Sequence, residues 1–302
     1  MRVAVTGAAG RLGRALIAAL EESPISGIGG PVAWTRADFD LDSPAGVGAI
    51  LERDQPEVVV HAAAWTDVDG CSREPARAMA RNGDATGVFA RACAAAGVDL
   101  VALSTNEVFD GRRTDGRGYR PDDPPNPINP YGESKLVGER LAAEAFSDLA
   151  DAHLAIVRTA WLFGPPGNDF PTRILAAGEK ARASGEALKV VGDEIGSPTY
   201  TLDLAEAIVD LLAAGEIGGV HHVVNAGRAS RADWARELFR QARLDLRMEE
   251  VPASTWPRAS TPPAWAVLEP TPLPSGEPLR PWQEAVADYL PALLRGRAGA
   301  AR

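Results

Sequence analysis

The first 22 residues carry the feature that most restricts how this chain can fold. A short apolar run at 2–6 (RVAVT) leads directly into Gly7, Gly10 and Gly13, and an amphipathic helical pattern (RALIAALEE) follows. Glycines placed in this way allow a tight turn, close approach of backbone to a pyrophosphate, and close packing of helix on strand. The N–H groups that open the helix then face the phosphates. The G-x-x-G-x-x-G spacing differs from the commonest dinucleotide fingerprint, and an ordinary turn is the alternative. The strand before the loop and the helix after it favour a dinucleotide site.

Strand and helix patterns alternate over the first two thirds of the chain. The third predicted strand (EVVVHAA, 57–63) is continuously apolar, as expected for a strand covered on both faces. Further strands are predicted at 32–34, 98–104 and 154–157, with helices at about 74–96 and from Tyr131 onward. This alternation predicts an α/β fold with a Rossmann-type doubly wound parallel sheet. Ligands of such sheets lie beyond the carboxyl ends of the strands, so the loops after the strands should share one rim.

The pattern loosens after residue 165. We expect residues 1–165 to form a dinucleotide-binding Rossmann domain and residues 166–302 mostly to form a smaller C-terminal substrate-binding lobe. Parts of 186–225 are expected to extend the sheet through the short strands LKVV and VHHVV. The proline-rich stretch after residue 260 is interpreted as an ordered wrapping loop.

Tyr131 and Lys135 are the candidate catalytic pair. Asn129-Pro130 suits a helix start, because proline lacks only an N–H that the first turn leaves unpaired. Residues four apart in a helix lie on one face, so the phenol and the ammonium should point the same way. A neighbouring cation lowers the pKa of a phenol from about 10, which makes tyrosine a usable proton donor and acceptor. A surface tyrosine beside a solvated lysine is the alternative, since Y-x-x-x-K alone is a common pattern.

Composition excludes several classes of function. A net charge of −10 argues against nucleic acid as a partner, and the absence of a long apolar stretch argues against a membrane span. The first strand begins at residue 2, so no signal peptide is expected. Only Cys71 and Cys93 are present, which predicts no disulfide framework and suits the reducing cytoplasm. We interpret all four histidines as structural and expect no catalytic metal; they are His61, His153, His221 and His222.

Several motifs together resemble the extended short-chain dehydrogenase/reductase family and, within it, the dTDP-4-dehydrorhamnose reductases. They are TGAAGRLG (6–13), HAAAWTDVD (61–69), STNEVFDG (104–111), YGESK (131–135), RTAWLFGPPGNDF (158–170) and DEIGSPT (193–199). The resemblance implies NADPH-dependent reduction of the 4-keto group of a nucleotide-linked 6-deoxyhexulose, in dTDP-L-rhamnose biosynthesis. Two alternatives stay open: a reductase or epimerase of another nucleotide deoxysugar, and a non-catalytic NADP-binding regulatory subunit.

The resemblance also implies roles for individual residues. Tyr131 would give its proton to the ketone oxygen, Lys135 would hold the nicotinamide ribose, and Thr105 would hydrogen-bond the same ketone oxygen. The implied cofactor-binding residues are Gly7, Gly10, Arg11, Leu12, Gly13, Arg36, Asp40, Leu41, Ala62, Ala63, Ala64, Tyr131 and Lys135. The implied substrate-binding residues are Thr66, Thr105, Asn106, Glu107 and Trp161. A core indole is the alternative for Trp161, and an exposed helix residue is the alternative for Asn82, which matches a supporting asparagine of the family.

The end of the second strand bears on the cofactor. An NAD-preferring site usually has a carboxylate there, whereas this chain has Trp34-Thr35-Arg36. Arg36 and Arg11 are therefore expected to pair a 2′-phosphate, which favours NADPH over NADH. Solvated arginines are the alternative, and NADH stays open.

Departures from the family pattern concern the substrate. Asn106 and Glu107 stand where these reductases have aspartate and tyrosine, and Thr261 replaces an arginine near the nucleotide phosphates. An acidic position that binds magnesium between subunits in some relatives is Ala15 here, so no ion is carried over. The sugar, its nucleotide carrier and a homodimeric state are left open.

Overall fold

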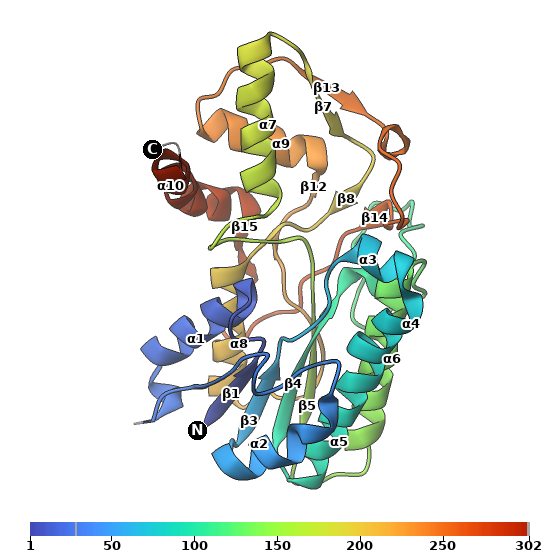
Figure 1. The fold of residues 1–302 in the computed structure, drawn as a ribbon, viewed down its shortest axis with the longest axis vertical. Coiled ribbons are helices and arrows are strands. Elements are labelled where there is room, and N and C mark those ends of the chain that lie inside the picture. Colours follow the sequence, from blue (N-terminus) through green and yellow to red (C-terminus); the bar gives the residue numbers. More distant parts are fainter. Residues whose placement is uncertain (28, 301–302) are drawn as a thin grey trace.

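A parallel sheet of six strands forms the centre of the lower lobe in the computed structural model, which describes residues 1–27 and 29–300 (Figure 1). The strand order is β10-β5-β4-β3-β1-β2, and every neighbouring pair is parallel. The strands are β1 (Val3–Thr6), β2 (Val32–Trp34), β3 (Val58–His61), β4 (Asp99–Thr105), β5 (Leu154–Thr159) and β10 (Gly219–His222). The chain leaves β1 for β2 on one side and then crosses to β3 on the other. The predicted Rossmann-type sheet is confirmed, and its switch point lies between β1 and β3.

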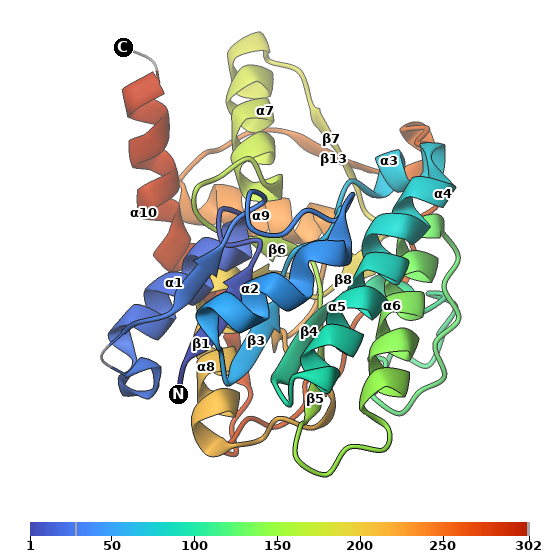
Figure 2. The same cartoon turned by 60° about the horizontal axis from the view of Figure 1, so that its bottom comes forward.

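Helices cover both faces of this sheet. Val3 and Val5 of β1 point into one apolar core with α1 and α8, while Ala4 points into the opposite core with α2 and α5. Successive residues of a strand face opposite sides, so an all-apolar strand needs a layer on each face. The two layers are visible in Figure 2. The helices are α1 (Arg11–Glu22), α2 (Val47–Asp54), α5 (Ala85–Ala95), α6 (Pro130–Phe146) and α8 (Thr201–Ala214).

Shorter helical segments complete the fold. They are η1 (Pro24–Ser26), η2 (Pro44–Gly46), α3 (Val68–Arg73), α4 (Pro75–Ala78), the π-helical turn η3 (Met79–Asp84), η4 (Asn106–Val108) and η5 (Ala253–Thr255).

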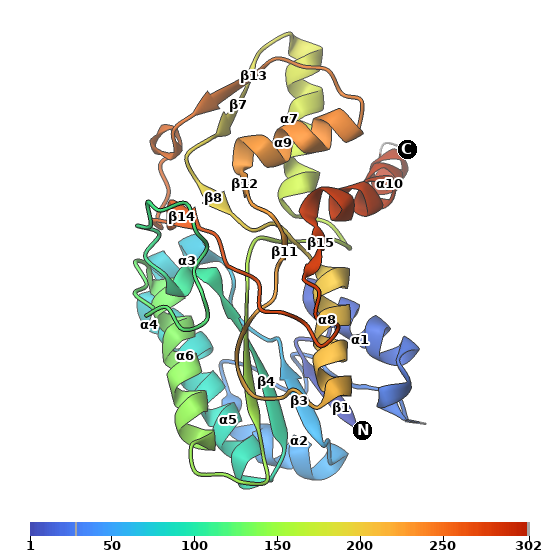
Figure 3. The same cartoon turned by 180° about the vertical axis from the view of Figure 1, so that it is seen from behind.

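The upper lobe lies above the central sheet in Figure 3. Its own apolar core includes Phe163, Trp234 and Tyr289. Its helices are α7 (Phe170–Ser184), α9 (Arg231–Gln241) and α10 (Trp282–Ala300). Its strands are β6 (Leu162–Phe163), β7 (Leu188–Val191), β8 (Ile195–Gly196), β9 (Thr199–Tyr200), β11 (Asn225–Ala226), β12 (Ala229–Ser230), β13 (Met248–Val251), β14 (Trp265–Ala266) and β15 (Leu279–Pro281). These strands form small two- and three-stranded ladders.

One part of the expected sheet extension is wrong. The LKVV segment does form a strand, β7, but it pairs with β13 in the upper lobe and not with the central sheet. The edge beside β5 is taken by β10, from the VHHVV segment, as expected. The exposed Lys189 suits a two-stranded ribbon and not a strand covered on both faces. The boundary at residue 165 stays a prediction.

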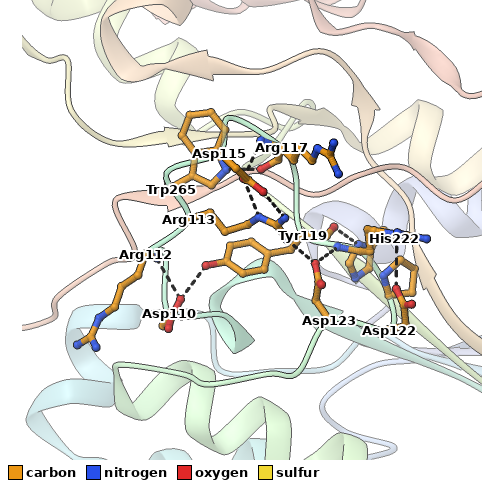
Figure 4. A network of polar contacts seen from close by, with 12 residues as sticks. Asp110, Arg112, Arg113, Asp115, Arg117, Tyr119, Asp122, Asp123, His222 and Trp265 are labelled. Atoms are coloured by element: carbon orange, nitrogen blue, oxygen red, sulfur yellow. Dashed lines mark hydrogen bonds and ion pairs between the residues drawn. The ribbon is translucent and has the colours of Figure 1, made fainter.

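The loop after β4 ties the two lobes together (Figure 4). Tyr119 stacks on Phe109 at 4.2 Å between ring centroids and donates from its hydroxyl to Asp110 at 2.7 Å. Trp265 of β14 donates from its indole N–H to the Arg117 carbonyl at 2.7 Å. The upper lobe is therefore in contact with the loop that leaves the carboxyl end of β4. Within the described residues, no helix has the length and apolar character needed to cross a membrane.

Candidate active site

The helix that carries the candidate catalytic pair begins as its sequence predicts. Asn129 is the N-cap residue of α6, and its Oδ1 accepts from the Gly132 N–H at 2.9 Å. Gly132 lies so close to η4 that a Cβ there would fall 2.8 Å from the Glu107 carbonyl carbon and nearer still to its oxygen. Glycine at this position therefore lets the first turn of α6 press against the end of β4, which brings Tyr131 beside Thr105.

A cavity of about 410 Å³ lies at this point and contains the predicted catalytic residues Tyr131, Lys135 and Thr105. The other predicted site residues that line it are Gly7, Gly10, Arg11, Leu12, Gly13, Ala62, Ala64, Thr66, Asn106, Glu107 and Trp161. Together these residues come from the loops after β1, β3 and β5, from the end of β4 with η4, and from the first turns of α1 and α6. The shared rim expected from the parallel sheet is thus observed as a geometric fact, while the chemical role of each residue stays a prediction.

A second cavity of about 290 Å³ adjoins the first across the switch point. It is lined by the predicted residues Arg36, Asp40, Leu41 and Ala63, and it shares Gly7, Gly10, Ala62 and Ala64 with the first cavity. Two cavities that share the glycine loop form one elongated site, which suits a ligand with two ends joined by a pyrophosphate.

The glycine loop fits such a ligand. Gly7 adopts a left-handed conformation with φ of 65°, and a Cβ at Gly7 would lie 3.0 Å from Ala63. A side chain at Gly13 would meet Ala8 Cα at 2.7 Å, so the helix could not pack onto the loop. The Arg11 Nε is buried without a hydrogen-bond partner in the described part of the chain. An orphaned buried donor beside an open glycine turn is what an anionic ligand would satisfy.

The expected pairing of Arg11 with Arg36 is wrong. Arg11 donates to the carbonyls of Leu162 at 3.2 Å and Gly167 at 2.7 Å, in the cavity of Tyr131. Arg36 lies at the other end, exposed, where it pairs with Asp40 at 3.2 Å. The reason is topological: Arg11 opens α1 and reaches toward the segment after β5, whereas Arg36 follows β2 on the far side of β1.

Arg81 is the second arginine at the Arg36 end, and sequence reasoning missed it. Its guanidinium lies 5.3 Å from the centroid of the Trp65 ring and also pairs with Asp42, which Arg36 contacts at 3.1 Å. Asp42 is 39 residues away in sequence, so no local pattern could have linked Arg81 to this cavity.

The acid–base properties of Tyr131 differ from the expectation. Its side chain is buried, and this burial raises the pKa of the phenol, with a further rise from Glu107 and a smaller opposing effect of a hydrogen bond to Thr105. The expected lowering by Lys135 is therefore wrong for this structure, because the cost of burying a phenolate is the largest effect. Burial also lowers the pKa of Lys135 to about 8, and Glu139 opposes that change. At neutral pH the phenol keeps its proton, and most of the lysine stays charged.

Thr105 and Asn106 hold the end of β4 in place. The Thr105 hydroxyl accepts from the Glu107 N–H at 3.2 Å and donates to the Asn106 Oδ1 at 3.3 Å. The Asn106 Nδ2 donates to the Ala266 carbonyl of the upper lobe at 3.2 Å. Asn106 lines the cavity, but its amide nitrogen is already engaged in joining the lobes.

Glu107 lines the cavity and is bound to the cap of α6. Its Oε2 accepts from the Asn129 Nδ2 at 2.6 Å, and that nitrogen also donates to the Thr261 carbonyl at 3.1 Å. Burial raises the Glu107 pKa, and the Asn129 hydrogen bond opposes the rise. Thr261 is thus attached through its backbone to the cap of α6, close to Glu107.

Trp161 both lines the cavity and packs against other side chains. It has a left-handed φ of 44°, which is rare for a bulky side chain and costs about 1–3 kcal/mol. The residue lines the cavity, and its ring centroid lies 6.0 Å from that of Trp234, in a stacked arrangement, and 3.5 Å from the guanidinium carbon of Arg231. Arg231 was not found from the sequence. Burial lowers its pKa to about 10, and Glu194 opposes that change at an ion-pair distance of 3.8 Å.

Asn82 supports the site from behind, and the exposed alternative is wrong. It is buried in the π-helical turn η3, where Oδ1 accepts from the Trp65 N–H at 2.8 Å. Its Nδ2 donates to the Trp65 carbonyl at 3.0 Å and to the Ser134 hydroxyl at 3.2 Å. Asn82 therefore links the loop after β3 to the helix of Tyr131. Among the described residues, no cluster of three or more His, Cys, Asp or Glu side chains is placed to hold a metal ion.

Known proteins share this fold and sequence over nearly the whole chain. A family profile described as RmlD substrate binding domain matches residues 1–295. A dTDP-4-dehydrorhamnose reductase from Streptomyces griseus is 37% identical over 302 residues, covering 98% of this chain and 94% of that protein. A dTDP-4-keto-6-deoxy-D-glucose reductase from Streptomyces niveus is 37% identical over 293 residues, covering 96% of each.

A solved structure is also similar. The dTDP-4-dehydrorhamnose reductase of Bacillus anthracis, in complex with NADP, superposes with a TM-score of 0.84 at 30% sequence identity. The match covers 95% of this chain and 98% of that structure. The similarity therefore extends over both lobes.

Proposed function

The chain belongs to the dTDP-4-dehydrorhamnose reductase family of extended short-chain dehydrogenases/reductases, and we propose that it reduces the 4-keto group of a dTDP-linked 6-deoxyhexulose with NADPH. The resemblance inferred from the motifs is thereby confirmed. The observation that carries the proposal is the meeting of Tyr131, Lys135 and Thr105 in one cavity with the glycine loop. A protein that only bound the cofactor would not need a proton donor, an ammonium and a second hydroxyl at one point, which disfavours a regulatory subunit.

NADPH supplies the hydride for this chemistry when it is bound. Gly7, Gly10 and Gly13 would receive the pyrophosphate, and Arg36 with Arg81 would face the 2′-phosphate of the adenosine end. The homologous Bacillus anthracis reductase was crystallised with NADP, which supports this choice of cofactor. NADH stays an alternative.

Tyr131 is the proton donor of the proposed reaction. Because burial keeps its phenol protonated, the O–H is ready to give its proton to the ketone oxygen as negative charge develops there. Thr105, which lines the cavity with Tyr131, would turn its hydroxyl proton from Asn106 to the same oxygen and place the carbonyl carbon. Lys135, on the same face of α6, would stabilise the phenolate that the transfer leaves behind.

The sugar end of the cavity is proposed to involve Thr66, Asn106, Glu107 and Trp161. Trp161 would contribute its indole to the wall beside the sugar, with Arg231 and Trp234 holding the ring in place. The Streptomyces niveus relative is named for a different 4-keto-6-deoxyhexose, which keeps another nucleotide deoxysugar as the second candidate substrate. We also propose a cytoplasmic location, which the free thiols of the buried Cys71 and Cys93 support. A homodimeric state and a division into two lobes at residue 165 belong to the same proposal.

The test is turnover. Loss of NADPH absorbance would be followed with dTDP-4-dehydrorhamnose, with dTDP-4-keto-6-deoxyglucose and with matched UDP- and GDP-sugars. We expect fastest turnover with a dTDP-linked 4-ketosugar. NADPH binding without turnover on any of the sugars would contradict catalysis and favour the regulatory alternative.

A further inference from the structure

The carboxylate of Glu139 joins three of the elements that build the active site. The Arg158 guanidinium of β5 contacts it twice, with Nε to Oε1 at 3.0 Å and Nη2 to Oε2 at 2.7 Å. The Ser104 hydroxyl, at the end of β4, donates to Oε1. The side chains of the ion pair are only 5% and 6% exposed. A buried carboxylate with a two-pronged arginine and a third donor has one preferred geometry, so it fixes the elements it joins.

Residues close in sequence to Ser104, Arg158 and Glu139 line the cavity. Thr105 comes directly after Ser104 on β4, Trp161 lies three residues after Arg158, and Lys135 is one turn before Glu139 on α6. The contact extends further through Arg158, whose Nη1 donates to the Pro121 carbonyl at 3.3 Å and lies 3.5 Å from His222 Nε2. The loop that contains Tyr119, which Figure 4 shows beside His222, is thus held by the same cluster.

Glu139 is the acidic residue whose charge acts on the pKa of Lys135, although Glu107 also lines the cavity. It is buried, and within residues 1–27 and 29–300 it makes no hydrogen bond or ion pair. Glu139 follows it by four residues, so both side chains lie on one face of α6. Four other titratable groups lie on the elements around it: Tyr131, which burial keeps protonated, Glu107, whose pKa burial raises, Arg158, which pairs with Glu139, and His61 of β3. Burial and Lys135 itself lower the His61 pKa to about 3, so this imidazole is neutral. Glu139 is the charged group that opposes the effect of burial on Lys135.

We propose that Glu139 is a positioning residue of this enzyme, which holds β4, β5 and α6 in their relative places and keeps the Lys135 ammonium charged in the cavity. The carboxylate does not touch substrate or cofactor; it acts through Lys135 and through the strand ends. This inference rests on the proposed function only for the reaction step that Lys135 serves.

The lysine content of the chain makes a direct test practical. Only Lys135, Lys180 and Lys189 are present, and the last two are exposed. Protein carrying lysine labelled at the ε-carbon would give three NMR signals, with Lys135→Arg used only to assign one of them. We expect the Lys135 signal to titrate near pH 8, with the two exposed lysines as internal references. In Glu139→Gln its midpoint should fall by roughly one pH unit or more. Glu144→Gln, the same change at an exposed position of α6, should leave it unchanged.

A second variant guards against misfolding. Glu139→Gln leaves Arg158 buried without its partner, which is strongly destabilising. The double variant Glu139→Gln/Arg158→Met removes both charges and should still lower the Lys135 midpoint. The decrease of kcat at alkaline pH should move to lower pH by the same amount, and Glu139→Asp should restore part of the shift. An unchanged Lys135 midpoint in the folded variants would overturn the inference. Because the titration needs no sugar, a failure of turnover would refute the proposed function without affecting this result.

Discussion

Substitution of Gly132 by alanine should damage both the stability and the activity of this protein. A Cβ at this position would lie 2.8 Å from the Glu107 carbonyl carbon and 3.0 Å from Pro127, whereas ordinary contact begins at 3.4 Å. The nearest atoms belong to backbone, which cannot turn aside as a side-chain end would. Either η4 or the first turn of α6 must therefore move.

The magnitude follows from two opposing effects. Overpacking of a tight contact costs about 1–3 kcal/mol, while alanine in place of glycine in a helix contributes up to about 1 kcal/mol of stability. The net loss should lower Tm by a few degrees, at roughly 2–4 °C for each kcal/mol in a large domain. The larger effect concerns catalysis. Tyr131 precedes Gly132, and a displacement of about 1 Å at a reacting group reduces turnover about 100-fold.

Thermal unfolding and steady-state kinetics with NADPH would measure these effects. Gly48→Ala is the matched control, because Gly48 lies in α2 with nothing within 4 Å of the new Cβ. That variant should be slightly more stable and fully active. If Gly132→Ala retains wild-type kcat and Tm, then the contact between α6 and η4 does not position Tyr131, and the reasoning is refuted.

Three further outcomes are expected. Tyr131→Phe should abolish most turnover while NADPH affinity, measured by fluorescence titration, stays nearly unchanged; an active variant would exclude the phenol as proton donor. Arg36→Ala should weaken NADPH binding much more than NADH binding, while Arg11→Ala, at the other end of the site, should weaken both alike; equal effects of Arg36→Ala on the two cofactors would contradict a 2′-phosphate contact. Burial lowers the pKa values of His61 and His222 to about 3 and about 4, so between about pH 6.5 and pH 4 the unfolded chain binds more protons, and stability should fall as pH falls. The Tm of His222→Gln should fall less steeply over that range than the wild-type Tm, and parallel curves would show that this imidazole is not buried in its neutral form.

Local sequence patterns predicted the parts of the site that depend on neighbouring residues. The start of α6 follows from the capping by Asn129 and from Pro130 in its first turn, and both are set within a few residues of Tyr131. The glycine turn after β1 is equally local. Parallel topology then places the loop ends on one rim whatever their sequences are, so most candidate residues of the cavity could be named in advance.

Errors occurred where a side chain is controlled by a distant partner. The sequence suggested that Arg11 would join Arg36, yet Arg11 bonds to carbonyls more than 150 residues away, at Leu162 and Gly167. The sequence also suggested that β7 extends the central sheet, whereas β7 pairs with β13. The composition of a strand does not show which sheet it will join. The partners of a side chain or an edge strand depend on which elements fold against it.

Short-range sequence pattern was therefore enough to predict the alternation of strands and helices, the glycine turn, the helix that presents Tyr131 and the family to which the protein belongs. The electrostatics of the site depend on contacts that form when the chain folds. Burial, and not the neighbouring lysine, has the largest effect on the pKa of Tyr131. Glu139 is bonded to Arg158 and Ser104, which lie 19 and 35 residues away in the sequence. The free energy of a charge depends on the water and the partners around it, and those are known only once the chain has folded.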